Sequence, residues 1–224
     1  MMLRASSRDA VDSAVGVVLL EALRSTDTPP ETLEAEDFTQ SLPRRLGLSG
    51  VIERQIERYT RLEEEGEGLE PSAAEDLFRL ISRREDSADV FRRAGRELAR
   101  RELRSRGIGS KALSWTGPTM LTRWLALRAA ARLARRVSPV ASVRTERSPP
   151  SLVVEGCLPA RACEGPDGCE VLARGLETFL GAYAGSEAPV VHPMCESVSD
   201  PACVFRLASR SEDRDRGDGD DAEA

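Results

Sequence analysis

The residues best suited to chemistry lie near the C-terminal end of this 224-residue chain. Cys169, His192, Cys195 and Cys203 follow the pattern C-x22-H-x2-C-x7-C, and His192 is the only histidine in the sequence. Thiolate and imidazole groups are ligands that zinc prefers, and four of them close a tetrahedral site with no position left for a substrate. The pattern therefore predicts a structural zinc site rather than a catalytic one.

Other interpretations of these residues stay open. Free cysteines are often small buried hydrophobic residues, so the group could consist of packed thiols beside a histidine that faces solvent. His192 could also act as the base of a cysteine nucleophile, although no orienting group or oxyanion donor is recognisable. Cys157 and Cys163 come shortly before the motif. They are candidates for alternative ligands, a redox pair or packing residues.

The composition limits the class of protein. The chain is 40% hydrophobic and 31% charged, with a formal net charge of −6, which is typical of a globular domain and argues against non-specific binding to nucleic acid. No segment approaches the roughly 18 apolar residues of a membrane span. We therefore expect a cytoplasmic protein. In that reducing compartment, an odd total of five cysteines favours free thiols or metal ligands over disulfides.

The periodicity of apolar residues divides the chain into a helical part and a β-containing part. Helical spacing predicts five helices, over residues 9–24, 48–62, 73–83, 86–104 and 118–137. Short β-branched runs then predict strands at 140–143 and 152–154, followed by a helix over 169–184 and strands at 190–194 and 203–207.

These elements indicate one α+β domain over residues 1–208. Mainly helical residues 1–137 would precede a β-β-α-β-β unit over residues 138–208. The short connection within each strand pair predicts a small antiparallel sheet, with helices packed on one side. Residues 209–224 are acidic and nearly devoid of apolar side chains, so we expect a disordered tail.

One predicted helix carries a row of arginines. Arg123, Arg128, Arg132, Arg135 and Arg136 share much of one side of the helix expected over 118–137. Such a row could bind an acidic partner, nucleic acid or a membrane surface. Because acidic segments elsewhere offset the charge, a solvated helix face is the preferred interpretation.

The C-terminal segment resembles a known family. Residues 195–207 combine Cys-x7-Cys, an acidic turn residue and a proline before the second cysteine, and then Val-Phe-Arg-Leu. This run is similar to the end of the 4-vinyl reductase domain family, which shares the fold of the TRAPP-complex trafficking subunits. The family includes sensor domains of phenol-responsive transcription activators and proteins tied to bacteriochlorophyll synthesis. The resemblance covers about residues 140–207.

The resemblance implies both a ligand set for the metal and a binding role. In the phenol-sensor relatives, three cysteines and one glutamate hold a structural zinc. The cysteines match Cys169, Cys195 and Cys203, and His192 stands at the glutamate position. Those sensors hold the phenol hydroxyl with a histidine and a tryptophan. Since His192 is the only histidine here, phenol is not implied as the ligand.

The sequence therefore favours a non-enzymatic sensory or regulatory domain for a small apolar or aromatic ligand. By the resemblance it would form a homodimer, and it would report to a separate output protein. The candidate pocket residues are Phe91, Trp115, Trp124, Phe179 and Tyr183, expected beside the zinc site. Two alternatives stay open. One is an enzyme or accessory factor in tetrapyrrole metabolism, although no glycine motif for a nicotinamide or flavin is present. The other is a scaffold without a ligand.

Overall fold

The first part of the described chain is helical, and the strands follow with two further helices between them. The computed structural model describes residues 9–27, 38–107, 119–185 and 189–208, with the side chains of the second helix described from residue 50 onward. Within these ranges the helices are α1 (Ser13–Asp27), α2 (Phe38–Glu64), α3 (Pro71–Ser82), α4 (Ser87–Ser105), α5 (Thr119–Val137), α6 (Leu158–Ala162) and α7 (Glu170–Ala184). Trp115 and the predicted acidic tail lie outside the described residues.

The strands form one small antiparallel sheet, as predicted. They are β1 (Ser142–Arg147), β2 (Pro150–Glu155), β3 (Val190–Met194) and β4 (Cys203–Leu207), and their order across the sheet is β1-β2-β4-β3. Every neighbouring pair is antiparallel. The two hairpins flank α7 in the sequence, so the β-β-α-β-β order and the α+β class are confirmed.

Several boundaries differ from the sequence-based expectation, and α2 begins at Phe38 rather than at residue 48. The first strand continues to Arg147, whereas the sequence predicted a loop from residue 145. β1 is an edge strand whose exposed positions carry Arg144 and Glu146, and charged residues are well tolerated at a sheet edge. The segment expected to be irregular, residues 157–168, contains the short helix α6 and a 3-10 turn, Pro166–Cys169.

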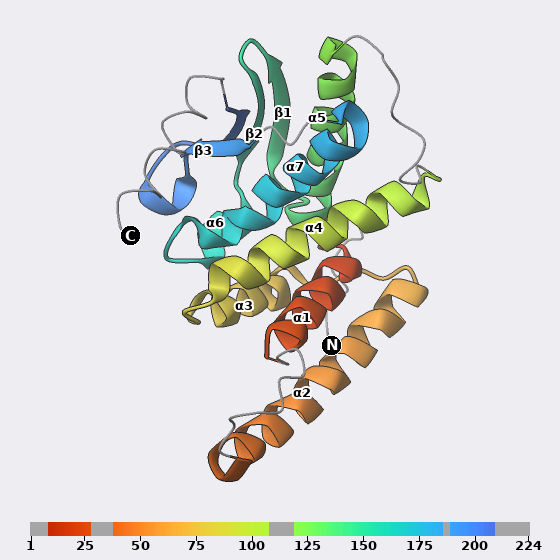
Figure 1. Cartoon of the computed structure of the whole chain (residues 1–224), viewed down its shortest axis with the longest axis vertical. Helices are drawn as coiled ribbons and strands as arrows, with labels where there is room; N and C mark the ends of the chain where they lie inside the picture. The colour runs from red at the N-terminus through yellow and green to blue at the C-terminus, as the bar shows by residue number, and fades with distance from the viewer. Residues whose placement is uncertain (1–8, 28–37, 108–118, 186–188, 209–224) are drawn as a thin grey trace.

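The elements are stacked in layers behind the sheet (Figure 1). α5 and α7 pack against the sheet, α4 packs along α7, and α1 lies between α4 and α2. The contact between α4 and α7 is close because both helices have a glycine there. A Cβ atom on Gly95 would overlap the carbonyl oxygen of Val171 in α7, and one on Gly175 would lie 3.6 Å from the carbonyl oxygen of Gly95. Gly175 also faces α5, where its Cβ atom would lie 2.6 Å from a methyl carbon of Leu133. The helices thus place the start of α7, and with it Cys169, at a fixed position.

A buried carboxylate connects three helical segments. The side chain of Glu102 in α4 is 9% exposed and binds Arg106 at 2.8 Å, Arg132 at 3.3 Å and Arg136 at 3.0 Å. Arg136 in α5 also binds Asp12, just before α1, at 2.6 Å. Burial alone would raise the pKa of Glu102, but the three guanidinium groups outweigh burial and hold this pKa below its ordinary value.

Among the described residues, no helix is both long enough and apolar enough to cross a membrane.

Candidate metal centre

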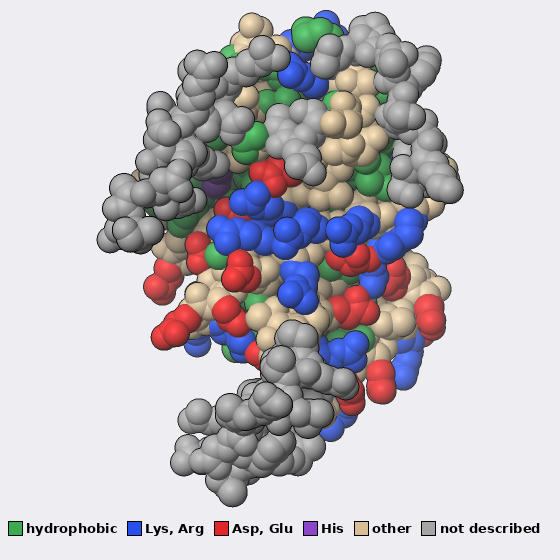
Figure 2. All heavy atoms as spheres, viewed as in Figure 1, with side chains coloured by type: hydrophobic (Ala, Val, Ile, Leu, Met, Phe, Trp, Pro, Cys, Tyr) green, Lys and Arg blue, Asp and Glu red, His purple; other side chains and the backbone are tan. Residues whose placement is uncertain are grey.

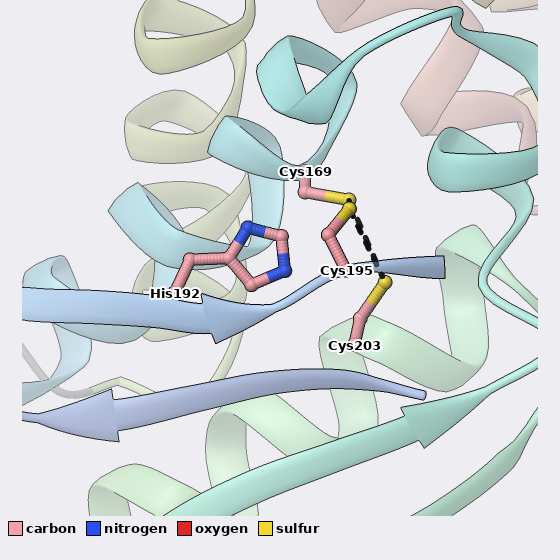
Figure 3. A group of neighbouring side chains, drawn as sticks. All are labelled: Cys169, His192, Cys195 and Cys203. Atoms are coloured by element: carbon pink, nitrogen blue, oxygen red, sulfur yellow. Dashed lines mark hydrogen bonds between the residues drawn. The ribbon is translucent and has the colours of Figure 1, made fainter. Parts of the chain in front are cut away.

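Four side chains, one just before α7 and three from the β3–β4 pair, meet in one place (Figure 3). Cys169 ends the 3-10 turn before α7, His192 lies in β3, Cys195 follows β3, and Cys203 begins β4. The sulfur atoms and a ring nitrogen all lie within 4.8 Å of one another. We call Cys169, His192, Cys195 and Cys203 the Cys3His cluster. They lie close enough to hold a metal ion.

The spacing of the sulfur atoms fits tetrahedral coordination. The sulfur of Cys169 lies 3.7 Å from that of Cys195 and 3.8 Å from that of Cys203, and the third pair is 3.9 Å apart. Zinc–sulfur bonds of about 2.3 Å in a tetrahedron place sulfur atoms about 3.8 Å apart. A disulfide requires a bond of about 2.05 Å, and all five cysteines are free. The three thiols therefore have the spacing of one face of a tetrahedral metal site.

The imidazole of His192 supplies the fourth donor. Its ring stacks on Phe205 of β4, with centroids 4.5 Å apart and an interplanar angle of 9°, and it faces the sulfur atoms in Figure 3. The Nε2 atom is buried and has no hydrogen-bond partner of normal geometry. A buried polar atom left unsatisfied costs about 1–3 kcal/mol. A metal ion held by the cluster would satisfy this nitrogen, and a histidine facing solvent is not what the structure shows.

The connection between β3 and β4 positions Cys195 through its backbone. The carboxylate of Asp200 accepts a hydrogen bond from the Cys195 amide at 2.7 Å. Ser199, just before Asp200, adopts the left-handed conformation with φ of 76°, which turns the chain back toward β4. Glu196 accepts hydrogen bonds from the amides of Gly156 at 2.6 Å and Cys157 at 2.8 Å. This carboxylate links the cluster to the end of β2.

Mutual interactions shift the pKa values within the cluster. Burial alone would lower the pKa of His192, but Cys195 and Cys203 outweigh it and raise this pKa to about 9. The hydrogen bond from the Cys169 thiol lowers the pKa of Cys195. For Cys203, the hydrogen bond with Cys157 raises the pKa, but those with Cys169 and Cys195 outweigh it, and the pKa falls to about 7. The interactions with Cys157, Cys195 and Cys203 instead raise the pKa of Cys169 well above its ordinary value. Thiolate, the form that binds metal, is therefore favoured at Cys195 and Cys203 and not at Cys169.

The remaining two cysteines have different surroundings. Cys157 is fully buried, and interactions with the thiols of Cys169 and Cys203 lower its pKa to about 5. Cys163 instead donates to the carbonyl oxygen of Phe78 at 3.8 Å and packs in the core. The sequence analysis did not distinguish Cys157 from Cys163. It also missed the hydrogen bonds that Glu196 and Asp200 form with backbone amides. The only signal for these two carboxylates was that they lie close to Cys195 in the sequence.

The predicted pocket residues are not brought together in one cavity. Phe91 and Phe179 are fully buried in the core, where Phe91 stacks on Phe78 with ring centroids 5.4 Å apart. Trp124 and Tyr183 line two different surface depressions. Trp115 lies outside the described residues. Of the five, Trp124 is the one that contributes to a mainly apolar groove.

This groove lies between the first turns of α5 and the turn of the first hairpin. Its volume is about 370 Å³. It is lined by Met120, Leu121, Arg123, Trp124, Leu127, Glu146, Arg147 and Pro150. We call it the α5–hairpin groove. Pro150 begins β2, whereas the Cys3His cluster lies near Cys157, beyond the other end of that strand. The groove is therefore not beside the cluster, where the sequence analysis placed the pocket.

Most of the arginines on α5 contact other residues of this chain. Arg132 and Arg136 bind Glu102, and Arg135 donates to the carbonyl oxygen of Val143 at 2.9 Å. Arg128 lies over the ring of Trp124, 4.6 Å from its centroid. Figure 2 shows a different basic row, which crosses one face at the place of α4 in Figure 1 and has acidic side chains beside it. These internal contacts leave little of the α5 row for an acidic partner.

Comparison of the whole chain with protein-family models, with curated proteins and with solved structures finds no match.

Proposed function

We propose that this chain is a small-molecule-binding sensory or regulatory module of the 4-vinyl reductase domain kind, stabilised by a structural zinc ion. Zinc is the metal that best suits three thiolates and one imidazole at tetrahedral spacing. Four protein donors leave no coordination position for water or substrate, so the ion has a structural role. The single observation that carries the metal assignment is the set of three sulfur separations of 3.7–3.9 Å beside the buried Nε2.

The α5–hairpin groove supports the binding role. Its volume of about 370 Å³ lies within the range of about 300–1,000 Å³ for small-molecule sites. Its walls are mainly apolar, and Met120 and Leu121 are 67% and 41% exposed. A small apolar or aromatic ligand would remove these side chains from water and stack on Trp124.

A fluorescence titration with the neutral aromatic probe N-phenyl-1-naphthylamine tests the binding role. Leu121→Glu places a charge in the groove wall, so the affinity for the probe should fall by at least about tenfold, which corresponds to about 1.4 kcal/mol. Leu80→Glu is the matched control, since Leu80 is 60% exposed on α3 and is not part of the groove lining.

Comparison of Leu121→Glu with Leu80→Glu distinguishes binding in the groove from non-specific binding to the surface. Equal loss of affinity in both variants, or none in Leu121→Glu, would show that the groove is not the binding site. Native mass spectrometry of the purified wild type supplies a second readout, because a ligand retained by the module appears as an added mass that Leu121→Glu lacks.

A further inference from the structure

We propose that a depression between the ends of α4 and α7 and the middle of α5 binds a phosphate group, either free or as the monoester of a small molecule. Its volume is about 590 Å³, within the range of about 300–1,000 Å³ for small-molecule sites. It shares no described lining residue with the α5–hairpin groove, so it goes beyond the proposed function. We call it the arginine pocket, and its described lining residues are Arg106, Leu125, Arg128, Arg132 and Tyr183.

Glu102 fixes two of the three arginines from behind the pocket. Its Oε1 atom accepts hydrogen bonds from Nε of Arg106 at 2.8 Å and from Nε of Arg132 at 3.3 Å. The Glu102 side chain is 9% exposed and is not part of the described lining. Because these contacts use Nε, the terminal NH2 groups of both arginines have no partner among the described residues and can donate to a ligand. Arginines held in place before binding lower its entropic cost.

Arg128 adds a positive charge that no described carboxylate balances. Its guanidinium group lies over the ring of Trp124, 4.6 Å from the centroid, and forms no ion pair with a described residue. This stacking orients the planar group and leaves its N–H edges open. Those edges suit the oxygen atoms of an anion, which arginine binds with two parallel hydrogen bonds.

Tyr183 is an independent indication of a polar ligand in the pocket. The residue is 6% exposed, yet its hydroxyl group has no hydrogen-bond partner among the described residues. The hydroxyl of a buried tyrosine usually finds a partner. Since Tyr183 lines the pocket, an oxygen atom of a bound anion would supply the missing partner.

The balance of charge favours phosphate over a single carboxylate. The three lining arginines and Arg136 carry four positive charges, whereas Glu102 and Asp12, which bind them, carry two negative charges. The two remaining positive charges match a phosphate monoester, which carries about −1.5 to −2 near neutral pH and offers three acceptor oxygens. The internal contacts of α5 leave little of its surface for a large acidic partner. A small anion needs only the N–H groups that stay open within the pocket.

Isothermal titration calorimetry of the full chain tests the site, with phenyl phosphate, inorganic phosphate and benzoate as probes at constant ionic strength. Arg128→Gln removes the unbalanced charge, and Tyr183→Phe removes only the hydroxyl group. Arg58→Gln is the matched control for charge, because Arg58 is exposed on α2 and is not part of the described lining.

We expect phenyl phosphate to bind at least about tenfold more tightly than benzoate, which has the same ring but one charge. Arg128→Gln should weaken phosphate binding at least about tenfold, because hydrogen bonds to charged groups are among the strongest. Tyr183→Phe should weaken it about 2–10-fold. Arg58→Gln should keep the wild-type affinity.

The two phosphate probes distinguish the sources of the group. Tighter binding of phenyl phosphate supports a monoester as the occupant, and binding of inorganic phosphate at least as tight supports free phosphate. Binding of neither probe contradicts the proposal, and so does an equal loss of affinity in Arg128→Gln and Arg58→Gln. Benzoate binding as tight as phenyl phosphate would also contradict it. Tyr183→Phe keeps the aromatic ring in the core, so its affinity decides the question even if Arg128→Gln does not fold.

Discussion

Asp200 and Glu196 orient the chain around the Cys3His cluster by accepting hydrogen bonds from backbone amides. Each carboxylate fixes a backbone amide, and so the direction of a neighbouring side chain: Asp200 holds Cys195, and Glu196 holds the loop that carries Cys157. Residues that orient ligands in this way are nearly as important to metal affinity as the ligands. These two carboxylates therefore help to bring Cys195 toward the other residues of the cluster and to fix the loop beside it.

Glu102 provides a prediction at the scale of one residue. Glu102→Gln should lower the free energy of unfolding by about 1–3 kcal/mol at pH 7, because Arg132 and Arg136 lose a charged, largely buried partner. The folded-state pKa of Glu102 is lowered, so its contribution is complete above the unfolded value of about 4.3 and is lost as pH falls through the folded value.

Urea denaturation at pH 7 and at about pH 3 measures this effect. The stability gap between the wild type and Glu102→Gln should narrow as the pH falls. Asp76→Asn is the control, because its partner Arg79 forms a surface pair in which the Asp76 side chain is 75% exposed. A gap that stays constant across this range would mean that the ion pairs do not stabilise the fold.

The position of Cys169 in the Cys3His cluster depends on the contact between α4 and α7. Gly95→Ala should destabilise the protein by about 1–3 kcal/mol, because the added methyl group meets the backbone of Val171 and the two helices must move apart. Gly181→Ala in α7 is the matched control. Nothing lies within 4 Å of its added carbon, so it should be neutral or stabilise by up to about 1 kcal/mol. Equal thermal shifts in the two variants would contradict close packing at Gly95.

The elements show what sequence periodicity can and cannot predict. α4 and α7 were predictable because apolar residues at helical spacing give the strongest local signal. The end of β1 was not, since Arg144 and Glu146 look like loop residues until the strand is known to be an edge. α6 is only five residues long, and its burial depends on packing against α3, which a local pattern does not contain.

The candidate site was predictable to a similar extent. Donor type and number alone were enough to predict that Cys169, His192, Cys195 and Cys203 lie together. Three thiols and one imidazole form a complete set of zinc ligands. The distinction between Cys157 and Cys163 needed three-dimensional information, since only the fold brings Cys157 to Cys169 and Cys203. A pocket is harder to predict, because aromatic residues at helical spacing serve the core as readily as a cavity, and Phe91 and Phe179 are fully buried in the core.

At the scale of the whole molecule, the Cys3His cluster connects separate parts of the sheet unit. It joins the start of α7, the end of β3 and the start of β4, and Glu196 adds the end of β2. The free energy of metal binding at such a site is also free energy of folding. Metal removal should therefore loosen residues 138–208, while the stack of α1, α4 and α5 retains its own core and the Glu102 ion pairs.

The metal content of the purified wild-type protein tests the central claim most directly. The protein is dialysed against metal-free buffer and analysed by inductively coupled plasma mass spectrometry, with circular dichroism as the control for folding. The Cys3His cluster predicts one zinc ion per chain, retained through dialysis. A folded protein that carries no stoichiometric metal and does not take up added zinc would contradict the account.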